Sequence, residues 1–378
     1  MPQIIGAALL LALLGQCAWF ISNVPLTQVE AAYVHDGLDY LSHQAVTFDT
    51  ARSPLTSLMA AVPLRIFHRN VEANYYDQFY MDSHRWLIRA PFLLSGLLLG
   101  ASLWYVARRL YGNTGGYIAL GMYAFNPAVI AHISFASTDA ITAWGAFGAV
   151  FTAIAVAHTL YAPREVILWN WRRILLLGFC VFLTMGGQFS ASLVLVLALA
   201  FMLWAVPERR GAALAIFSAG VAVGLVFLTA AYLFRPGQYW HGLITAQWFR
   251  PSLVALASPF GYRVAAYFYL HEALAPTVLF GVALLVYVAW RRTRFFGNTA
   301  PLLVVVAALV LALLMPGVVG YGFYFVALPF LMLFSSGVMT DVIENPKLGL
   351  ILGVVMGILL TQAVVGIMGL AHLSRSVR

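Results

Sequence analysis

Residues 4–22 read IIGAALLLALLGQCAWFIS, nineteen consecutive residues without a charged side chain. An α-helix needs about twenty such residues to cross the hydrocarbon core of a bilayer. No basic residue precedes the stretch, and Gln16 before Cys17 makes a poor lipoprotein cleavage site, which disfavours a cleaved signal peptide. We therefore expect residues 4–22 to be retained as a first membrane span.

Comparable apolar runs recur along the whole chain. Hydrophobic residues make up 62% of the 378 residues and charged residues only 9%, whereas a soluble domain carries about 25% charged residues. This composition predicts an all-α, polytopic transmembrane helix bundle of about eleven spans, built as a single membrane domain over residues 1–378. The expected spans are 4–22, 86–107, 115–132, 139–161, 173–186, 190–206, 212–234, 273–290, 299–315, 322–340 and 348–371.

The distribution of arginine predicts the orientation of these spans. Arginine clusters fall on alternate connections, and connections rich in basic residues face the cytoplasm. The N-terminus is then cytoplasmic, and residues 23–85 and 235–272 form two long outer loops of a multi-pass membrane protein. The clusters are Arg108-Arg109, Arg164 with Arg172-Arg173, Arg209-Arg210, and Arg291-Arg292 with Arg294.

The first outer loop, residues 23–85, contains two amphipathic segments. Residues 27–42 place Val29 and Tyr33 among polar neighbours, and residues 54–67 begin with a proline, which is acceptable in a first helical turn. Such segments are typical of helices that lie in the membrane interface. We expect two interfacial helices in this loop rather than a soluble domain.

In this topology most acidic and histidine residues share the outer side of the membrane. Polar chemistry gathered at one surface indicates a one-sided site rather than a continuous path across the bilayer. Only Glu165, Glu208, Asp341 and Glu344 are expected inside. The outer set comprises Glu30, Asp36, Asp39, Asp49, Glu72, Asp77, Asp82, Asp139 and Glu272, with His35, His43, His68, His84, His132, His241 and His271.

Some classes of function are excluded or disfavoured. The net charge of +8 does not indicate nucleic-acid binding, because no basic soluble domain exists to carry it. Cys17 and Cys180 both lie inside apolar runs, which disfavours a disulfide or a metal site. A transporter is disfavoured because the spans show neither clear internal repeats nor charged residues near their midpoints.

Several short motifs follow one another along nearly the whole chain. Their order, and the layout of one span, a long outer loop and a bundle, resembles the type-C glycosyltransferase superfamily. The likeness is strongest to bacterial relatives of the dolichyl-phosphate-mannose protein mannosyltransferases. It implies transfer of a sugar from a polyprenyl-phosphate carrier at the outer face of a bacterial inner membrane. The motifs are Glu30-Ala-Ala-Tyr-Val-His-Asp-Gly37, Ser53-Pro-Leu55, Arg89-Ala-Pro-Phe92, Asn126-Pro127, Ser137-Thr-Asp-Ala140, Phe260-Gly261 and Leu328-Pro-Phe330.

The chain also departs from this family at four charged positions. Val29 stands where the family has the Asp of an Asp-Glu pair, and Gln188 stands where it often has Lys. Leu274-Ala-Pro276 replaces a Lys-Thr-Pro, and an Arg-Tyr is missing near Gly322-Phe323. These departures leave an alternative open, in which the chain is a catalytically inactive descendant that serves as a structural or lipid-binding subunit of a larger membrane complex.

A transferase of this kind needs a carboxylate that takes the proton of the acceptor hydroxyl. The resemblance suggests Glu30 and Asp139 as catalytic residues. Glu30 could instead be a solvated surface carboxylate. Asp139 lies in a turn with His132 and Ser137, and could instead cap the helix that begins there.

The transferase also needs positive charge beside the lipid phosphate. We expect substrate binding from Arg52, Arg85, His132 and Arg263, although outer arginines could equally anchor the protein to lipid headgroups. Asp139 is also the expected ligand of Mg²⁺ or Mn²⁺. The expected partners are membrane lipid and a polyprenyl-phospho-sugar, with other membrane subunits in the inactive alternative.

Overall fold

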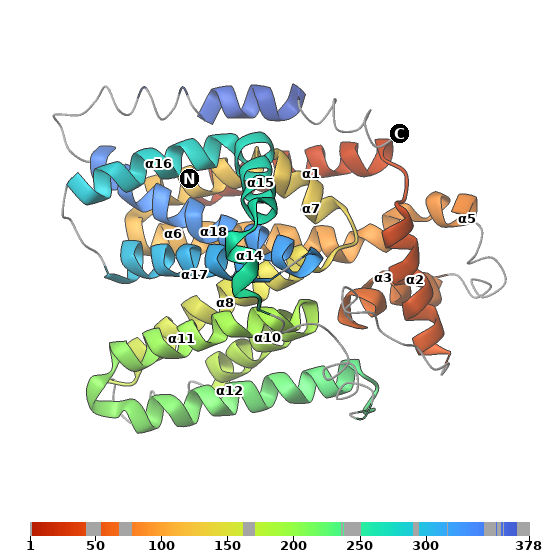
Figure 1. The fold of residues 1–378 in the computed structure, drawn as a ribbon, viewed down its shortest axis with the longest axis horizontal. Helices are drawn as coiled ribbons and strands as arrows, with labels where there is room; N and C mark the ends of the chain where they lie inside the picture. Colours follow the sequence, from red (N-terminus) through yellow and green to blue (C-terminus); the bar gives the residue numbers. More distant parts are fainter. Residues whose placement is uncertain are drawn as a thin grey trace.

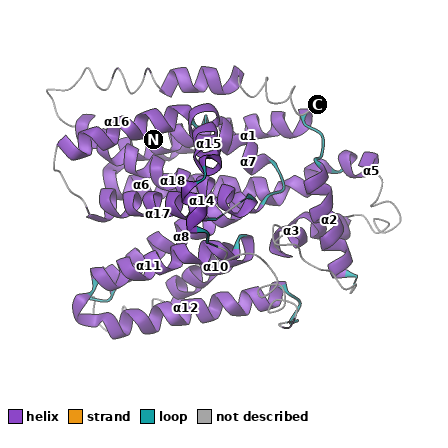
Figure 2. Ribbon diagram, viewed as in Figure 1, coloured by secondary structure: helices purple, strands orange, loops and turns teal. Residues whose placement is uncertain are grey.

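The computed structural model describes residues 2–42, 54–67, 78–161, 171–235, 237, 251–289, 295–315, 317–343, 353, 357 and 359–368. Within these residues the chain is all-helical and contains no strand (Figure 2). The elements are α1 (Pro2–Asn23), α2 (Gln28–Leu41), α3 (Pro54–Phe67), α5 (Gln78–Ser83), α6 (Arg85–Ala124), α7 (Pro127–Ser134), α8 (Thr138–Thr159), α10 (Trp171–Gly187), α11 (Ser192–Ala205), α12 (Arg210–Ala231), α14 (Leu253–Ala257), α15 (Pro259–Tyr267), α16 (Leu274–Ala289), α17 (Ala300–Leu314) and α18 (Val318–Ile343). Two 3-10 turns, η1 (Phe189–Ala191) and η2 (Pro207–Arg209), two π-helical turns, η3 (Phe268–Glu272) and η4 (Phe295–Thr299), and an apolar helix Leu359–Met368 complete this part.

Six described helices are long and apolar enough to cross a membrane, or seven if α15–η3 and α16, which meet at a bend of 102°, are counted as one broken span. These helices make the chain a membrane helix bundle. The larger number of about eleven spans stays a prediction.

Helix α6 is a hairpin of two antiparallel arms rather than one long rod. Gly112 interrupts it with φ +80° and ψ −172°, a conformation that is essentially restricted to glycine. The second arm returns along the first, because the Tyr123 hydroxyl donates to the Gly96 carbonyl at 2.8 Å and Gly116 lies against Trp104. The first arm corresponds to the run expected at 86–107. The run expected at 115–132 is divided between the second arm and α7.

Helix α18 is the central element of the bundle. It packs against α6, α8, α16 and α17. Within its apolar membrane-spanning stretch, 94% is buried inside the protein. Helices α10, α11 and α12 lie side by side along one edge of the bundle (Figure 1). The apolar core around α18 therefore fixes which helix ends meet, and so positions the polar residues at those ends.

The predicted segments of the first outer loop are helical. Thr27 caps α2 in a reciprocal box with Glu30, and α2 packs on α3 so closely that a Cβ at Gly37 would lie 2.2 Å from the Ser57 carbonyl oxygen. Both helices lie with α5 at one end of the molecule (Figure 1). Their location in the membrane interface stays a prediction.

Most of the described carboxylates lie at one end of the bundle, and three arginine pairs lie at the other. One end, called the cluster end below, is formed where α2, the start of α6, the α7–α8 connection, η3 and the start of α18 meet. At the opposite end, the Tyr111 hydroxyl donates a hydrogen bond to the Gly297 carbonyl, and Arg209 donates one to the Leu160 carbonyl. The cluster end carries Glu30, Asp36, Asp39, Asp82, Asp139 and Glu272, and the opposite end carries Arg108, Arg109, Arg172, Arg173, Arg209 and Arg210.

Candidate functional site

A cluster of three charged side chains lies at the cluster end, where α7, α8 and η3 meet. His132 Nδ1 lies 2.8 Å from Asp139 Oδ2, and His132 Nε2 lies 3.9 Å from Glu272 Oε2. Tyr321, from the first turns of α18, donates its hydroxyl to Glu272 Oε2 at 3.3 Å. His132 therefore lies between two carboxylates. The name "acidic cluster" is used below for His132, Asp139, Glu272 and Tyr321.

Local sequence signals bring His132 and Asp139 together. Asn126 caps α7 through its side chain and Pro127 occupies the first position of that helix. Ser137 caps α8 by accepting from the Asp139 amide at 3.4 Å. The alternative that Asp139 is the N-cap is therefore wrong. Asp139 lies within the first turn, where the helix dipole favours a negative charge, and its side chain is available to His132.

Aromatic rings enclose the imidazole of His132. Phe325 and Tyr321 stack on it, with ring centroids 4.8 Å and 5.7 Å away, and Phe268 meets it edge-on at 5.9 Å. Only 13% of the His132 side chain is exposed. The rings shield most of the imidazole from solvent and so strengthen its pairing with the carboxylates.

This environment changes the pKa of His132, which lies outside the candidate membrane spans. Burial by itself lowers the pKa, but hydrogen bonding and charge from Asp139 and Glu272 outweigh burial and raise it from 6.5 to about 9. His132 is therefore a cation at neutral pH. The acidic cluster then carries one positive and two negative charges.

The side chains of Gln188 and Asp139 both lie beside Gly322 in the backbone of α18. A Cβ at Gly322 would lie 2.3 Å from Gln188 Oε1 and 3.5 Å from Asp139 Oδ1, so both oxygens face this glycine. Gln188 is the position where the resemblance predicts Lys. The departure therefore falls beside the acidic cluster, where it places a neutral amide instead of a second cation.

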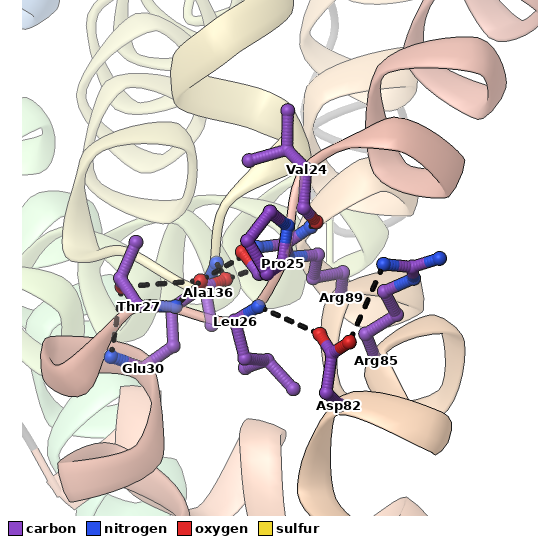
Figure 3. A network of polar contacts seen from close by, with 9 residues as sticks. All are labelled: Val24, Pro25, Leu26, Thr27, Glu30, Asp82, Arg85, Arg89 and Ala136. Atoms are coloured by element: carbon purple, nitrogen blue, oxygen red, sulfur yellow. Dashed lines mark hydrogen bonds and ion pairs between the residues drawn. The ribbon is translucent and has the colours of Figure 1, made fainter. Parts of the chain in front are cut away.

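Glu30 is held elsewhere at the same end, by Arg89 (Figure 3). Arg89 Nε donates to Glu30 Oε1 at 2.8 Å and Arg89 Nη2 to Oε2 at 2.7 Å, and both side chains are almost fully buried. The Ala136 amide donates to Oε1 at 2.9 Å, and the Thr27 amide and hydroxyl donate to Oε2 at 2.9 and 3.1 Å. The alternative of a solvated surface carboxylate is therefore wrong.

These five hydrogen bonds occupy the acceptor positions of the Glu30 carboxylate, which offers about four lone pairs. The geometry thus gives no support to Glu30 as a base for a substrate. Instead, Glu30 ties the α7–α8 connection, through Ala136, to α2 and α6. That connection carries Asp139, so the Glu30–Arg89 pair supports the acidic cluster from outside it.

The arginines expected to bind substrate do not enter the acidic cluster. Arg85 donates to the Ser22 carbonyl at 2.7 Å and lies 3.6 Å from Asp82 (Figure 3). Arg263 is exposed on α15, and Arg52 lies outside the described residues. Their predicted role in substrate binding stays a prediction, whereas His132 lies inside the cluster.

Sequence reasoning assigned no role to Glu272 or Tyr321. Glu272 was recognisable only as an outer carboxylate directly before an apolar run, and nothing in the sequence links it to His132. The π-helical turn η3 brings Phe268 and Glu272 to the same imidazole. Such turns are frequent at functional sites.

The divalent metal expected at Asp139 stays a prediction for the described residues. They contain no group of three His, Cys, Asp or Glu side chains arranged to hold a metal ion. Asp139 Oδ2 is also already paired with His132 Nδ1. Mg²⁺ and Mn²⁺ require several oxygen ligands, so the mechanism proposed below uses His132 as its cation.

Two cavities flank the acidic cluster. The first, of 410 Å³, lies between the start of α7, α16 and the helix Leu359–Met368, and Glu272 lines it. The second, of 310 Å³, lies between α14, α15 and the α17–α18 connection, and Tyr321 lines it. The residues of the acidic cluster can therefore contact molecules bound on two sides.

The sequence matches no protein-family model and no curated protein. The structure is similar to ArnT from Cupriavidus metallidurans bound to undecaprenyl phosphate, with a TM-score of 0.62 at 14% identity over 88% of this chain and 59% of that one. It is also similar to the archaeal oligosaccharyltransferase AglB from Archaeoglobus fulgidus in complex with an inhibitory peptide and a dolichol-phosphate, with a TM-score of 0.58 at 13% identity over 100% of this chain and 56% of that one.

These neighbours show what fold the chain has. At identities this low the likeness concerns the fold alone, which this chain shares with these two membrane proteins. It does not single out the protein mannosyltransferase relatives expected from the motifs. The chain spans a little over half of the length of the neighbours it matches.

Proposed function

We propose that this protein is a membrane glycosyltransferase that takes a sugar from a polyprenyl-phosphate carrier at the outer face of a bacterial inner membrane. The observation that carries the proposal is the acidic cluster, a buried cation between two carboxylates beside two cavities, in the fold of transferases solved with undecaprenyl phosphate and dolichol-phosphate. The N-terminus is cytoplasmic in this proposal, which places the cluster end outside.

Glu272 is the carboxylate that takes the proton from the acceptor hydroxyl. It is the more exposed of the two, at 25% against 13% for Asp139, and it lines a cavity. A positioned general base contributes about 10²–10⁴-fold to a rate. Asp139, predicted from sequence as a catalytic residue, acts here by holding His132 charged and oriented.

His132 supplies the charge that the leaving phosphate needs. As the bond between the sugar and the phosphate oxygen breaks, the electron pair stays with the phosphate. An imidazolium in a site that excludes water stabilises this developing negative charge more strongly than one in solution. Arg263 and the other outer arginines would attract the phosphate to the surface.

The test uses the purified full chain in lipid nanodiscs with a radiolabelled polyprenyl-phospho-sugar and a bacterial lipid extract as the acceptor source. Sugar transfer and release of polyprenyl phosphate are measured with Mg²⁺, with Mn²⁺ and with a chelator. We expect Glu272→Gln to lower the rate by about 10²-fold or more, and Asp139→Asn to lower it through loss of the His132 charge. Asp36→Asn, which removes a carboxylate of α2 outside the acidic cluster, is the matched control and should keep the wild-type rate.

An inactive descendant that binds lipid within a larger complex is the second proposal. It is favoured by Val29, which replaces the expected Asp and is 60% exposed, and by the commitment of Glu30 to Arg89. In that case the wild-type protein would bind polyprenyl phosphate without any turnover, and would co-purify with other membrane subunits. Turnover that Glu272→Gln abolishes would exclude this second proposal.

A further inference from the structure

The 410 Å³ cavity beside Glu272 has mainly apolar walls. Leu274, Pro276 and Val278 of α16 face Val365 of the helix Leu359–Met368 across it. Leu274, Val278 and Val365 are also 45–57% exposed, so the cavity opens between the two helices onto an apolar surface. Its volume lies within the range of about 300–1,000 Å³ that holds small ligands.

Two buried amide atoms at this cavity lack a partner among the described residues. Asn126 Nδ2 and Gln362 Oε1 make no hydrogen bond, although Asn126 is 0% and Gln362 5% exposed. Leaving such a group unpaired costs about 1–3 kcal/mol. Buried polar atoms normally have partners, so this pair calls for a ligand.

In each side-chain amide, the atom that is already hydrogen-bonded identifies the unpaired atom as a donor or an acceptor. Asn126 Oδ1 accepts from the Val129 amide at 3.0 Å, which makes the free atom the NH₂ donor. Gln362 Nε2 donates to the Met122 carbonyl at 3.1 Å, which makes the free atom the carbonyl acceptor. Flipping either amide would break these bonds. Two residues that line the cavity therefore carry one unpaired donor and one unpaired acceptor.

A hydroxyl group matches a donor and an acceptor of this kind, because it accepts one hydrogen bond and donates another. A phosphate at neutral pH offers mainly acceptor oxygens, and it would lie beside the Glu272 carboxylate and the Gln362 carbonyl. The cavity is thus unsuited to the phosphorylated carrier. The apolar walls instead suit a single hydrocarbon chain.

We infer that this cavity binds the acceptor substrate, and that the acceptor is a neutral lipid with a hydroxyl headgroup. The inference rests on the proposed function. The hydroxyl oxygen forms the bond to the anomeric carbon of the sugar as the bond from that carbon to the carrier phosphate breaks. The bonding electrons leave with the phosphate. The hydroxyl turns its proton from Gln362 to Glu272, which lines the same cavity and takes the proton up.

Binding is tested separately from transfer by photolabelling the full chain in nanodiscs. The probes are a fatty alcohol with a diazirine in its chain and the fatty phosphate with the same chain and diazirine. We expect the alcohol to label α16 and the helix Leu359–Met368 at least fivefold more than the phosphate. Val365→Trp fills the cavity and should reduce labelling at least fivefold.

Val364→Trp is the matched control, because Val364 is 59% exposed on the same helix but does not line the cavity. It should label like the wild type. Val278→Trp fills the cavity from the opposite wall and replaces Val365→Trp if that variant fails to fold. Equal labelling in the filled variants, or stronger labelling by the phosphate, would overturn the inference and leave water as the partner of the two amides.

A sugar-transfer assay distinguishes failure of this inference from failure of the proposed function. With a polyprenyl-phospho-sugar, the long-chain alcohol should become glycosylated, whereas its methyl ether, which has no proton to lose, should not. If the protein transfers sugar to a component of the lipid extract but never to a bound alcohol, the acceptor assignment fails and the proposed function stands. If no acceptor supports turnover, the proposed function itself fails and the acceptor assignment fails with it.

Discussion

Arg89 and Glu30 form a buried ion pair in which two further guanidinium donors are also used. Arg89 Nη1 and Nη2 donate to the Val24 and Pro25 carbonyls, both at 2.8 Å, and Phe135 lies under the guanidinium at 5.1 Å from ring centroid to Cζ. The pair therefore holds the chain between α1 and α2 as well as the α7–α8 connection. Its loss would affect the geometry of the site without removing any residue of the acidic cluster.

Glu30→Gln leaves Arg89 buried without its counter-charge. We expect the free energy of unfolding to fall by about 3–5 kcal/mol, the usual cost of breaking a buried pair by removing one partner. The measurement is unfolding in mixed micelles with increasing denaturing detergent. Asp82→Asn is the control, because its pair with Arg85 at 3.6 Å is partly exposed and should contribute less than about 1 kcal/mol.

The double variant Glu30→Gln with Arg89→Met should recover part of the loss, since it removes the unpaired charge. Equal stability of wild type and Glu30→Gln would contradict the buried pair.

The raised pKa of His132 predicts that the stability of the fold depends on pH. Its pKa is about 9 in the folded protein and 6.5 as the model-peptide value, so folding favours the protonated form. The contribution, roughly 3 kcal/mol from this difference, is complete below about pH 6.5 and is lost as the pH rises to about 9. We therefore expect the midpoint of thermal unfolding in detergent to fall across this range.

His132→Gln should remove most of that fall, because the titrating group is gone. His158→Gln, at the opposite end of the bundle, should keep it. The groups facing His132 are Asp139 from α8, Glu272 from η3 and Tyr321 from α18. A wild-type curve that is flat from pH 6.5 to pH 9 would argue against the charged imidazole.

At the scale of elements, the break between α6 and α7 is stabilised by amide side chains. Pro127 has no N–H, so the helix cannot continue through it and nearby carbonyls lose their partners. Gln362 donates to the Met122 carbonyl and Gln16 donates to the Ala124 carbonyl at 3.0 Å. Side chains of two helices distant in sequence thus donate hydrogen bonds to the free carbonyls at the break. Apolar surroundings require this, because they offer no water as a donor.

The hairpin of α6 depends on Gly112 for conformational reasons only. A Cβ there would meet nothing within 4 Å, but φ is +80°. We expect Gly112→Ala to lower the free energy of unfolding by about 1–3 kcal/mol through backbone strain. Gly121→Ala also meets open space but without a positive φ, and should be neutral or stabilising by up to about 1 kcal/mol.

The comparison is made by unfolding both variants in the same detergent. If both alanines have the same effect, the turn at Gly112 is not strained by a side chain and the hairpin has another cause.

At the scale of the whole molecule, small residues let the helices of the bundle approach closely. A Cβ on Gly145 of α8 would lie 2.5 Å from the Thr184 amide of α10, and one on Gly220 of α12 would lie 2.8 Å from Leu177. Lipid offers no hydrophobic drive for helices to associate, so close packing at small residues contributes much of the cohesion. The orientation of the bundle in the membrane is predicted from its charges instead.

Orientation is tested by labelling single cysteines in intact bacterial cells with a membrane-impermeant maleimide. Asp36→Cys, on α2 at the cluster end, should be labelled, whereas Asn113→Cys, in the turn of α6 at the opposite end, should be labelled only after the cells are opened. The basic residues of the opposite end are the physical reason. Cys17 and Cys180 are buried and give a low background. Labelling of position 113 alone would place the acidic cluster in the cytoplasm and contradict the proposed function.

The sequence alone determined that this chain is an all-helical membrane protein with most of its carboxylates and histidines gathered at one end. Those properties follow from composition and from charge along the chain, which need no knowledge of which helices touch. It also pointed to His132 and Asp139, because a capped turn of eight residues brings them together locally.

Only the tertiary structure decided which distant residues complete the site. Glu272 and Tyr321 lie more than a hundred residues from His132 and meet it because α18 packs at the centre of the bundle. Glu30 looked the same in sequence as a catalytic carboxylate, and only the position of Arg89, fifty-nine residues away, shows that its oxygens are already bonded. Charge and hydropathy are properties of the chain, whereas the pairing of side chains depends on helix packing, which a single sequence does not encode locally.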